Sequence, residues 1–297
     1  MAHLVYFCAM DISQGINAQE LFRFIRNRLE AAFDPPEARQ MAALLLEHFA
    51  GMGLKQIIAY PATVVEVAQL NKISEAVERL LRHEPLQYIT GFACFCGNEF
   101  RVNPDVLIPR PETEELVRWV LDEHADKHNL NIADIGTGTG CIAISLWLRL
   151  QDAGVDAYDI SADALKLAVQ NNEELGSGVK FHSMDFLNHG QWPDKQFDII
   201  VSNPPYIPLK NKDLLPFNVS RFEPAGALFV PDDDPLVFYK TLAIFARSRL
   251  KPGGMMYVEV HEHYAEEGAG YFRHSGFGMV ELRRDLNEKN RMVRCCL

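Results

Sequence analysis

The chain has 297 residues, of which 48% are hydrophobic and 23% are charged. This is the composition of a folded globular protein, and the length suffices for two domains, so wholesale disorder is excluded. The 29 basic and 40 acidic residues give a net charge of −11, and the parts before and after residue 100 are both acidic. A protein that binds nucleic acid through its phosphates normally carries excess positive charge, so the sequence disfavours direct nucleic-acid binding.

The cellular location follows from what the sequence lacks. No apolar run reaches the length of about 18 residues that spans a bilayer, and the first residues have neither the basic start nor the cleavage site of a secretory signal. The six cysteines include no Cys-x-x-Cys pair, which argues against a disulfide scaffold or a structural zinc site. We therefore expect a cytoplasmic protein with reduced thiols, no metal and no membrane contact.

The N-terminal part predicts a small helical domain. Apolar residues recur at three- and four-residue spacing in 21–33, 38–51 and 64–83, the pattern of amphipathic helices. We assign residues 1–84 to this domain and expect residues 1–16 to be an extension that it does not need.

Residues 85–108 predict a β-hairpin that joins two domains, because aromatic and β-branched residues flank Gly91 and Gly97-Asn98. The remaining residues, 109–297, begin with a helix start, in which Pro111 and Glu112 suit a first helical turn.

Strands and helices alternate beyond about residue 130, which predicts an α/β fold. The expected strands are 131–136, 154–160, 179–185, 197–203 and 254–260, and the expected helices are 140–150, 162–175 and 235–250. The strands are continuously apolar, as in a parallel sheet with helices on both faces. Two further strands are expected in the C-terminal tail.

A glycine-rich loop follows the first of these strands. Its sequence is Asp134-Ile135-Gly136-Thr137-Gly138-Thr139-Gly140, and glycines there let the backbone turn tightly and approach a ligand closely. Asp159, at the end of the second strand, can accept both hydrogen bonds of a ribose diol. The pattern fits either a nicotinamide cofactor or S-adenosylmethionine. The Gly-x-Gly-x-Gly spacing and the leading Asp134 favour S-adenosylmethionine.

A second motif, Asn203-Pro204-Pro205-Tyr206, directly follows the fourth strand. The two proline rings preset the turn, so the Asn203 side-chain oxygen and the Pro204 carbonyl can each accept one N–H of a planar NH2 group. Tyr206 can stack on its flat face. Such a site can hold a weakly nucleophilic amide nitrogen in line with a sulfonium methyl group, and it needs no strong base beforehand.

Together these segments resemble the release-factor glutamine methyltransferases, the HemK/PrmC family of class I S-adenosylmethionine-dependent enzymes. The resemblance covers the chain from about residue 17. It is carried by Pro85–Gly91, Val106–Glu114, the glycine loop and the Asn-Pro-Pro-Tyr motif, with support from Arg221–Pro224 and Leu250–Gly254.

The resemblance implies that residues 109–297 form an S-adenosylmethionine-dependent methyltransferase domain, with a Rossmann-like, mostly parallel sheet and an antiparallel strand near the C-terminus. It also implies that the helical N-terminal domain helps to dock the partner. It implies methyl transfer from S-adenosylmethionine, leaving S-adenosylhomocysteine, to the amide nitrogen (N5) of the glutamine in the Gly-Gly-Gln motif of class 1 peptide chain release factors. We also expect the protein to be a monomer. The residues assigned to the cofactor are Gly136, Thr137, Gly138, Thr139, Gly140, Asp159, Phe186 and Asn203; those assigned to the glutamine are Asn203, Pro204, Pro205 and Tyr206, with Asn203, Pro204 and Tyr206 catalytic.

Two loops depart from the family pattern. Residues 230–236 keep aspartates but lack the usual glycines, and His261-Glu262-His263 stands where a glycine-containing loop is common. We interpret the two histidines as part of a solvated loop and not as metal ligands.

Three alternative functions remain open at this point. A methyltransferase acting on adenine or guanine amino groups would use the same Asn-Pro-Pro-Tyr residues on a flipped base, but the acidity of the chain disfavours it. A nicotinamide oxidoreductase would explain the glycine loop and Asp159 but not the second motif. A non-enzymatic adaptor is disfavoured because every expected pocket residue is present.

Overall fold

The computed structural model describes residues 15–297. It divides into two compact units, one that ends at Gly91 and one from Phe92 to Leu297. The expected extension, 1–16, lies almost entirely outside the described residues, and the expected hairpin segment, 85–108, is divided between the two units. Among the described residues, no helix combines the length and the apolar character needed to cross a membrane.

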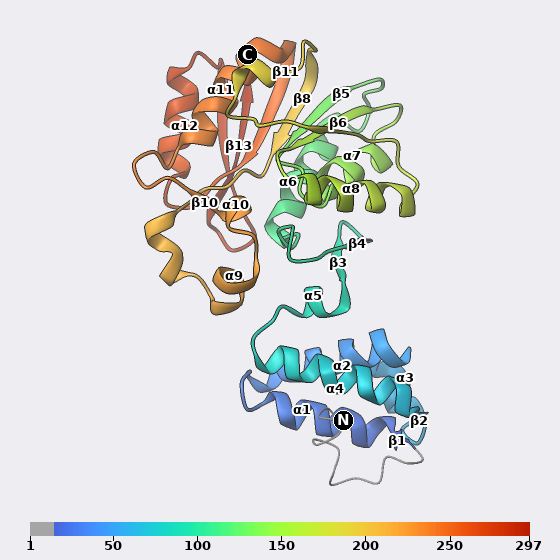
Figure 1. Cartoon of the computed structure of the whole chain (residues 1–297). Helices are drawn as coiled ribbons and strands as arrows, with labels where there is room; N and C mark the ends of the chain where they lie inside the picture. The colour runs from blue at the N-terminus through green and yellow to red at the C-terminus, as the bar shows by residue number, and fades with distance from the viewer. Residues whose placement is uncertain (1–14) are drawn as a thin grey trace. The chain divides into compact units, whose positions relative to one another are not determined.

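The first unit is built from helices (Figure 1). They are α1 (Ala18–Leu29), α2 (Pro35–Ala50), α3 (Leu54–Ala59), α4 (Val67–Leu81) and α5 (Leu86–Thr90), with two short antiparallel strands, β1 (Ile16–Asn17) and β2 (Val64–Val65). Local sequence sets the ends of these helices. The side chains of Asn17 and Asp34 accept backbone N–H groups at 2.9 Å to cap α1 and α2, and Gly51 ends α2 with a φ of 67°. The three predicted helices correspond to α1, α2 and α4, except that residues 64–65 form β2.

The second unit contains one seven-stranded sheet in the order β12-β13-β11-β8-β5-β6-β7. Its strands are β5 (Asn131–Ile135), β6 (Gly154–Asp159), β7 (Lys180–Ser183), β8 (Phe197–Ser202), β11 (Leu250–Glu259), β12 (Met279–Arg284) and β13 (Asn290–Cys296). The first five are parallel, and β13 is antiparallel to both of its neighbours. The predicted α/β class and the seven predicted strands are therefore confirmed.

Helices cover both faces of this sheet, as the continuously apolar strands predict (Figure 1). They are α6 (Pro111–His124), α7 (Cys141–Arg149), α8 (Ala162–Glu174), α11 (Val237–Arg249) and α12 (Ala265–His274). Successive residues of one strand join different cores: Ile132 packs with α6 and α7, whereas Ala133 packs with α11. Both residues are fully buried. Packing on both faces therefore holds the sheet, and with it the ends of its strands, in a fixed position.

A hairpin of β3 (Phe92–Phe95) and β4 (Asn98–Arg101) opens the second unit, turning at Cys96 and Gly97 with positive φ. The hairpin is anchored by Asn171 of α8. The Asn171 side chain pairs with the backbone N–H and carbonyl of Arg101 and also donates to the carbonyl of Thr139, at 2.7, 3.2 and 2.9 Å. The hairpin is therefore tied to the glycine-rich loop.

The chain between β8 and α11 forms an excursion of short elements, for which the sequence predicts no regular structure. It contains β9 (Ile207–Pro208), the 3-10 helix η3 (Leu209–Leu214), α9 (Phe217–Phe222), α10 (Ala225–Leu228) and β10 (Phe229–Val230). β9 and β10 pair in parallel, which closes the excursion at its base. Further elements outside the predicted set include α3, α12 and a 3-10 turn, η2 (His189–Gln191). Residues 86–90, expected within the β-hairpin, form the helix α5 instead, and the hairpin itself spans residues 92–101.

Candidate active site

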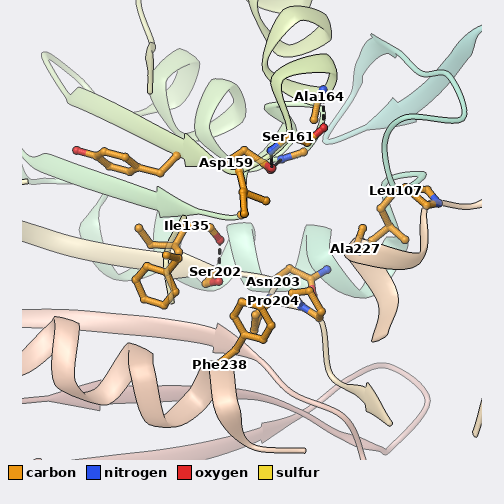
Figure 2. A pocket seen from close by; sticks show the side chains of 18 of the residues that line it. Leu107, Ile135, Asp159, Ser161, Ala164, Ser202, Asn203, Pro204, Ala227 and Phe238 are labelled. Carbon is orange, nitrogen blue, oxygen red and sulfur yellow. Dashed lines mark hydrogen bonds between the residues drawn. The ribbon is translucent and has the colours of Figure 1, made fainter. Parts of the chain in front are cut away.

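Three neighbouring strands end at the same edge of the sheet and carry the predicted motifs there. Because β8, β5 and β6 are adjacent and parallel, the glycine-rich loop, Asp159 and Asn203 meet at their carboxyl ends. The Ser202 hydroxyl donates to the Ile135 carbonyl at 2.7 Å and so joins the ends of β8 and β5. A cavity of about 460 Å³ opens at this edge (Figure 2).

The residues around this cavity come from well-separated parts of the sequence. They are Asp105, Val106, Leu107, Ile135, Gly136, Gly138, Tyr158, Asp159, Ile160, Ser161, Ala164, Met184, Asp185, Phe186, Leu187, Ser202, Asn203, Pro204, Pro205, Pro224, Gly226, Ala227 and Phe238. In Figure 2, Asp159 and Asn203 approach the cavity from different strands, and Leu107 and Ala227 bound it on another side. The lining contains three aspartates and neither lysine nor arginine, which suits a ligand of positive charge.

The glycine-rich loop needs glycine for two different reasons. Gly136, Gly138 and Gly140 all have positive φ, at 75°, 55° and 80°. A Cβ on Gly136 or Gly138 would meet no atom within 4 Å, so these two positions leave the backbone open to a ligand. A Cβ on Gly140 would instead lie 3.0 Å from Ile144, so this glycine permits close packing of α7.

Asp159 joins the glycine-rich loop to the start of α8. Its two carboxylate oxygens accept the backbone N–H groups of Gly138 and Ser161, at 2.8 and 2.9 Å. Burial raises the pKa of Asp159, and the backbone N–H groups of Ser161, Gly138 and Ile160 oppose this rise by stabilising the charged form. The carboxylate retains further lone pairs that can accept hydrogen bonds from a ligand.

The other residues predicted for the cofactor divide into two groups. Phe186 lines the cavity and stacks on Trp192, with ring centres 5.9 Å apart. Thr137, Thr139 and Gly140 do not contribute to the lining. The Thr137 hydroxyl donates to Asp134 at 2.6 Å, and the Thr139 hydroxyl accepts the N–H of Cys141 at 3.3 Å, so both threonines hold the loop in shape.

A second cavity of about 280 Å³ shares Leu107, Asn203, Pro204 and Ala227 with the first. The remaining lining residues are Arg110, Glu112, Tyr206, Ile207, Leu215, Pro216, Val219, Leu228, Glu259 and Arg291. The turn at Asn203 and Pro204 therefore borders both cavities. Of the residues predicted for the glutamine, Asn203, Pro204 and Tyr206 line this cavity, whereas Pro205 lines the larger one.

The Asn203 and Tyr206 side chains are linked by a chain of hydrogen bonds. Asn203 Nδ2 donates to Thr113 Oγ1 at 3.0 Å, and the Thr113 hydroxyl donates to Glu259 Oε2 at 2.6 Å. The Tyr206 hydroxyl donates to Glu259 Oε1 at 3.1 Å. Burial and the nearby Glu259 raise the pKa of Tyr206 well above its usual value, so Tyr206 remains a neutral donor.

Sequence reasoning did not assign site roles to Thr113 and Glu259. Glu259 has a sequence signal, because a carboxylate at the end of a continuously apolar strand has to find partners when buried. Thr113 has no such signal apart from its place in the helix start after Arg110, because its hydrogen-bond partners come from distant parts of the chain.

Glu223 holds two walls of the larger cavity together. Its carboxylate pairs with Arg110 and also accepts the backbone N–H of Ile108 at 3.2 Å. Glu223 lies next to Pro224, and Ile108 lies next to Leu107, and both Pro224 and Leu107 line the cavity. Arg110 thus does more than begin a helix.

Comparisons with known proteins identify the family. Residues 114–219 match the family model of the methyltransferase small domain, and residues 20–91 match that of the PrmC N-terminal domain. The release factor glutamine methyltransferase of Bacteroides thetaiotaomicron is 40% identical over 91% of this chain and 96% of that protein. The enzyme of the same name from Flavobacterium psychrophilum is 36% identical over 90% of this chain and 94% of that protein. The chain belongs to the release factor glutamine methyltransferase family.

A solved structure extends the likeness of the fold. A methyltransferase from Pyrococcus furiosus is 16% identical and superposes with a TM-score of 0.50, covering 75% of this chain and 98% of that one. At this identity the likeness concerns the fold, and it agrees with the sheet described above.

The two loops that depart from the family pattern are ordered by local contacts. In residues 230–236, Asp232 accepts the backbone N–H of Lys210 at 2.8 Å, and Asp234 pairs with Lys240 at 2.7 Å. The imidazole of His261 packs edge-on against Tyr206, with ring centres 5.5 Å apart. His261 therefore supports the wall of the smaller cavity.

Asp134 should make the stability of the fold depend on pH. It is fully buried, and burial raises its pKa from 3.8 to about 7 despite the Thr137 hydroxyl. Between these values the folded state holds a proton that the unfolded chain has lost, so the contribution of Asp134 to the free energy of unfolding falls as pH rises.

Denaturant titrations of the wild type and Asp134→Asn between about pH 4 and pH 7 test this. The slope of the free energy of unfolding against pH should be more positive in the variant than in the wild type, by up to about 1.4 kcal/mol per pH unit. Parallel stability curves would contradict the raised pKa.

Proposed function

We propose that this chain transfers the methyl group of S-adenosylmethionine to the side-chain amide nitrogen of the glutamine in the Gly-Gly-Gln motif of class 1 peptide chain release factors. Membership of the family supports this activity. The observation that carries it is the turn at Asn203 and Pro204, which borders two cavities of unequal size. A donor and an acceptor of a methyl group can meet only where their binding sites share a wall.

The larger cavity suits S-adenosylmethionine. Its volume of about 460 Å³ falls within the range of small-molecule sites. Its acidic lining favours the positively charged methyl donor over a nicotinamide dinucleotide, whose pyrophosphate is negatively charged. When bound, S-adenosylmethionine would supply a methyl group on a cationic sulfur. As the glutamine nitrogen bonds to this carbon, the carbon–sulfur bond would break, neutral S-adenosylhomocysteine would leave, and the nitrogen would release one proton to solvent.

We assign the cofactor contacts to residues that face the larger cavity. The open backbone at Gly136 and Gly138 allows close approach, Asp159 accepts the ribose hydroxyls, and Phe186 flanks the adenine. Thr137, Thr139 and Gly140 act indirectly, because they fix the shape of the loop.

The smaller cavity suits the glutamine side chain. The Asn203 side-chain oxygen and the Pro204 carbonyl can accept the two N–H groups of the amide, and the Tyr206 ring can cover its flat face. A glutamate carboxylate would offer these acceptors no hydrogen, so the arrangement selects the amide. Holding the nitrogen in line with the methyl group lowers the barrier without a strong base.

We assign docking of the release factor partly to the helical residues 1–84. Within the described part of this segment, Ile58, Tyr60 and Val64 are 67%, 67% and 57% exposed. Exposed apolar side chains of this size are better suited to contact a protein partner than to contact a phosphate backbone. This assignment agrees with the net acidity of the chain.

The direct test of the proposed function is methylation in vitro. The protein is incubated with isotopically labelled S-adenosylmethionine and a class 1 release factor, and the modified peptide is identified by mass mapping. The label should appear on the Gly-Gly-Gln glutamine and be absent from a release factor in which alanine replaces this glutamine. Label on another residue, or on ribosomal RNA alone, would overturn the proposal.

Asn203→Ala should lower the methylation rate by at least about 100-fold, because it removes one of the two acceptors that orient the amide. The affinity for S-adenosylmethionine should change much less, because the glycine-rich loop and Asp159 remain. Single-turnover rates with saturating release factor separate chemistry from binding. A rate near that of the wild type would exclude the amide clamp.

Asp159→Ala should weaken S-adenosylmethionine binding by about 2–4 kcal/mol, because the ribose hydroxyls and two backbone N–H groups lose a charged acceptor. Asp163→Ala is the matched control: Asp163 is an exposed aspartate in the first turn of α8 that does not line the cavity. Calorimetry measures both affinities. Equal effects of the two substitutions would mean that Asp159 acts only through its charge at a distance.

Replacing Ile58 and Tyr60 by serine should raise the KM for whole release factor several-fold, because the loss of their apolar contacts should weaken binding by about 1 kcal/mol. The KM for a short Gly-Gly-Gln peptide should stay the same. Lys55→Ser is the control, because Lys55 is exposed and lies, like Ile58, in helix α3. If KM rises equally for both substrates, or for neither, these side chains do not dock the partner.

A further inference from the structure

The amide clamp requires the Asn203 side chain to face the substrate with its oxygen. An asparagine amide has an acceptor on one side and two donors on the other, and the two ends have nearly the same shape. Only the Oδ1 end can accept an N–H of the glutamine. The Asn-Pro-Pro-Tyr motif itself does not decide which end points inward, so another part of the chain has to set the direction.

Thr113 is the residue that contacts the other end of this amide. Asn203 Nδ2 donates to Thr113 Oγ1 at 3.0 Å. A threonine hydroxyl has a single hydrogen, and that of Thr113 is given to Glu259 Oε2 at 2.6 Å. The hydroxyl therefore offers Asn203 only lone pairs, to which Nδ2 can donate and Oδ1 cannot.

Glu259 sets the polarity of this chain of hydrogen bonds. An ionised carboxylate only accepts, so it forces both Thr113 and Tyr206 to donate. Burial raises the pKa of Glu259 and the negative charge of Glu112 adds to this rise, whereas the Thr113 hydroxyl, Arg291 and the Tyr206 hydroxyl oppose it. In the observed geometry both hydroxyls donate to this carboxylate. One carboxylate thereby orients both the asparagine and the tyrosine of the motif.

The arrangement is shielded from water and supported by rigid elements. Thr113 lies in the first turn of α6 and is 3% exposed; Glu259 is the last residue of β11 and is 1% exposed. At this depth a hydroxyl cannot exchange its partner for bulk water without leaving a buried polar group unpaired. The direction of the hydrogen bonds is thus held by the fold.

We propose that Thr113 and Glu259 are positioning residues, which hold the Asn203 amide with its oxygen toward the substrate glutamine. This inference rests on the proposed function. It adds that the Glu259 carboxylate on β11, acting through the Thr113 hydroxyl on α6, sets the direction in which Asn203 Oδ1 points.

Thr113→Val is the primary test, because valine has nearly the shape of threonine but cannot accept the Asn203 N–H. The single-turnover rate, with saturating S-adenosylmethionine and release factor, should fall by about 10- to 100-fold. The affinity for S-adenosylmethionine should change by less than about twofold. Thr113→Ser keeps the hydroxyl and should restore most of the rate.

Glu259→Gln provides a second test with a side chain of nearly the same size. The glutamine amide can donate to Thr113, whose hydroxyl hydrogen is then free to attract Asn203 Oδ1 away from the substrate. The rate should therefore fall at least as far as in Thr113→Val. If Thr113→Val does not fold, Glu259→Gln decides the proposal.

A double-mutant cycle tests whether Thr113 acts through Asn203. In the Asn203→Ala background, Thr113→Val should cause no further loss of rate, because the group that it orients is gone. Additive losses would overturn the proposal, as would a normal rate in Thr113→Val or equal losses in Thr113→Val and Thr113→Ser. These outcomes are distinct from failure of the proposed function, in which the wild type itself does not methylate the glutamine.

Discussion

The parallel pairing of β8, β5 and β6 is the constraint on which the site depends. Because these strands are neighbours and run in one direction, their carboxyl ends lie together, and motifs from residues 136, 159 and 203 meet. Helices on both faces hold the strands in register, since Ile132 and Ala133 are buried in different cores. The position of the chemistry is therefore decided by sheet topology.

Charge is arranged differently in the two cavities that meet at Asn203. The larger cavity has aspartates along its lining, which favours a cationic methyl donor. The smaller cavity is lined by Glu259 and Arg291, whose charges are opposite in sign, and we propose that it holds the neutral amide of the substrate glutamine. Positioning then has to supply the selectivity, because a neutral amide is distinguished from a carboxylate only by the hydrogens that it donates.

Much of the fold could be predicted from local patterns, whereas the support of the site could not. Continuous apolar strands and helix spacing identify the sheet and its covering helices, and glycine spacing with Asp159 marks one edge of it. The excursion after Pro208 lacks regular periodicity, so its short elements were missed. The contact of Thr113 with Glu259 joins residues 146 apart, and no local pattern contains such a pair. The roles of Thr137, Thr139 and Gly140 likewise depend on packing behind the loop.

The measurement that tests this account most directly is a crystal structure of the protein with S-adenosylhomocysteine and a Gly-Gly-Gln peptide. The account predicts the nucleoside in the larger cavity beside Asp159 and the glutamine side chain in the smaller one. The glutamine nitrogen should lie about 3 Å from Asn203 Oδ1 and the Pro204 carbonyl, with Asn203 Nδ2 still on Thr113. A glutamine amide bound away from Asn203, or facing its Nδ2 group, would contradict the account.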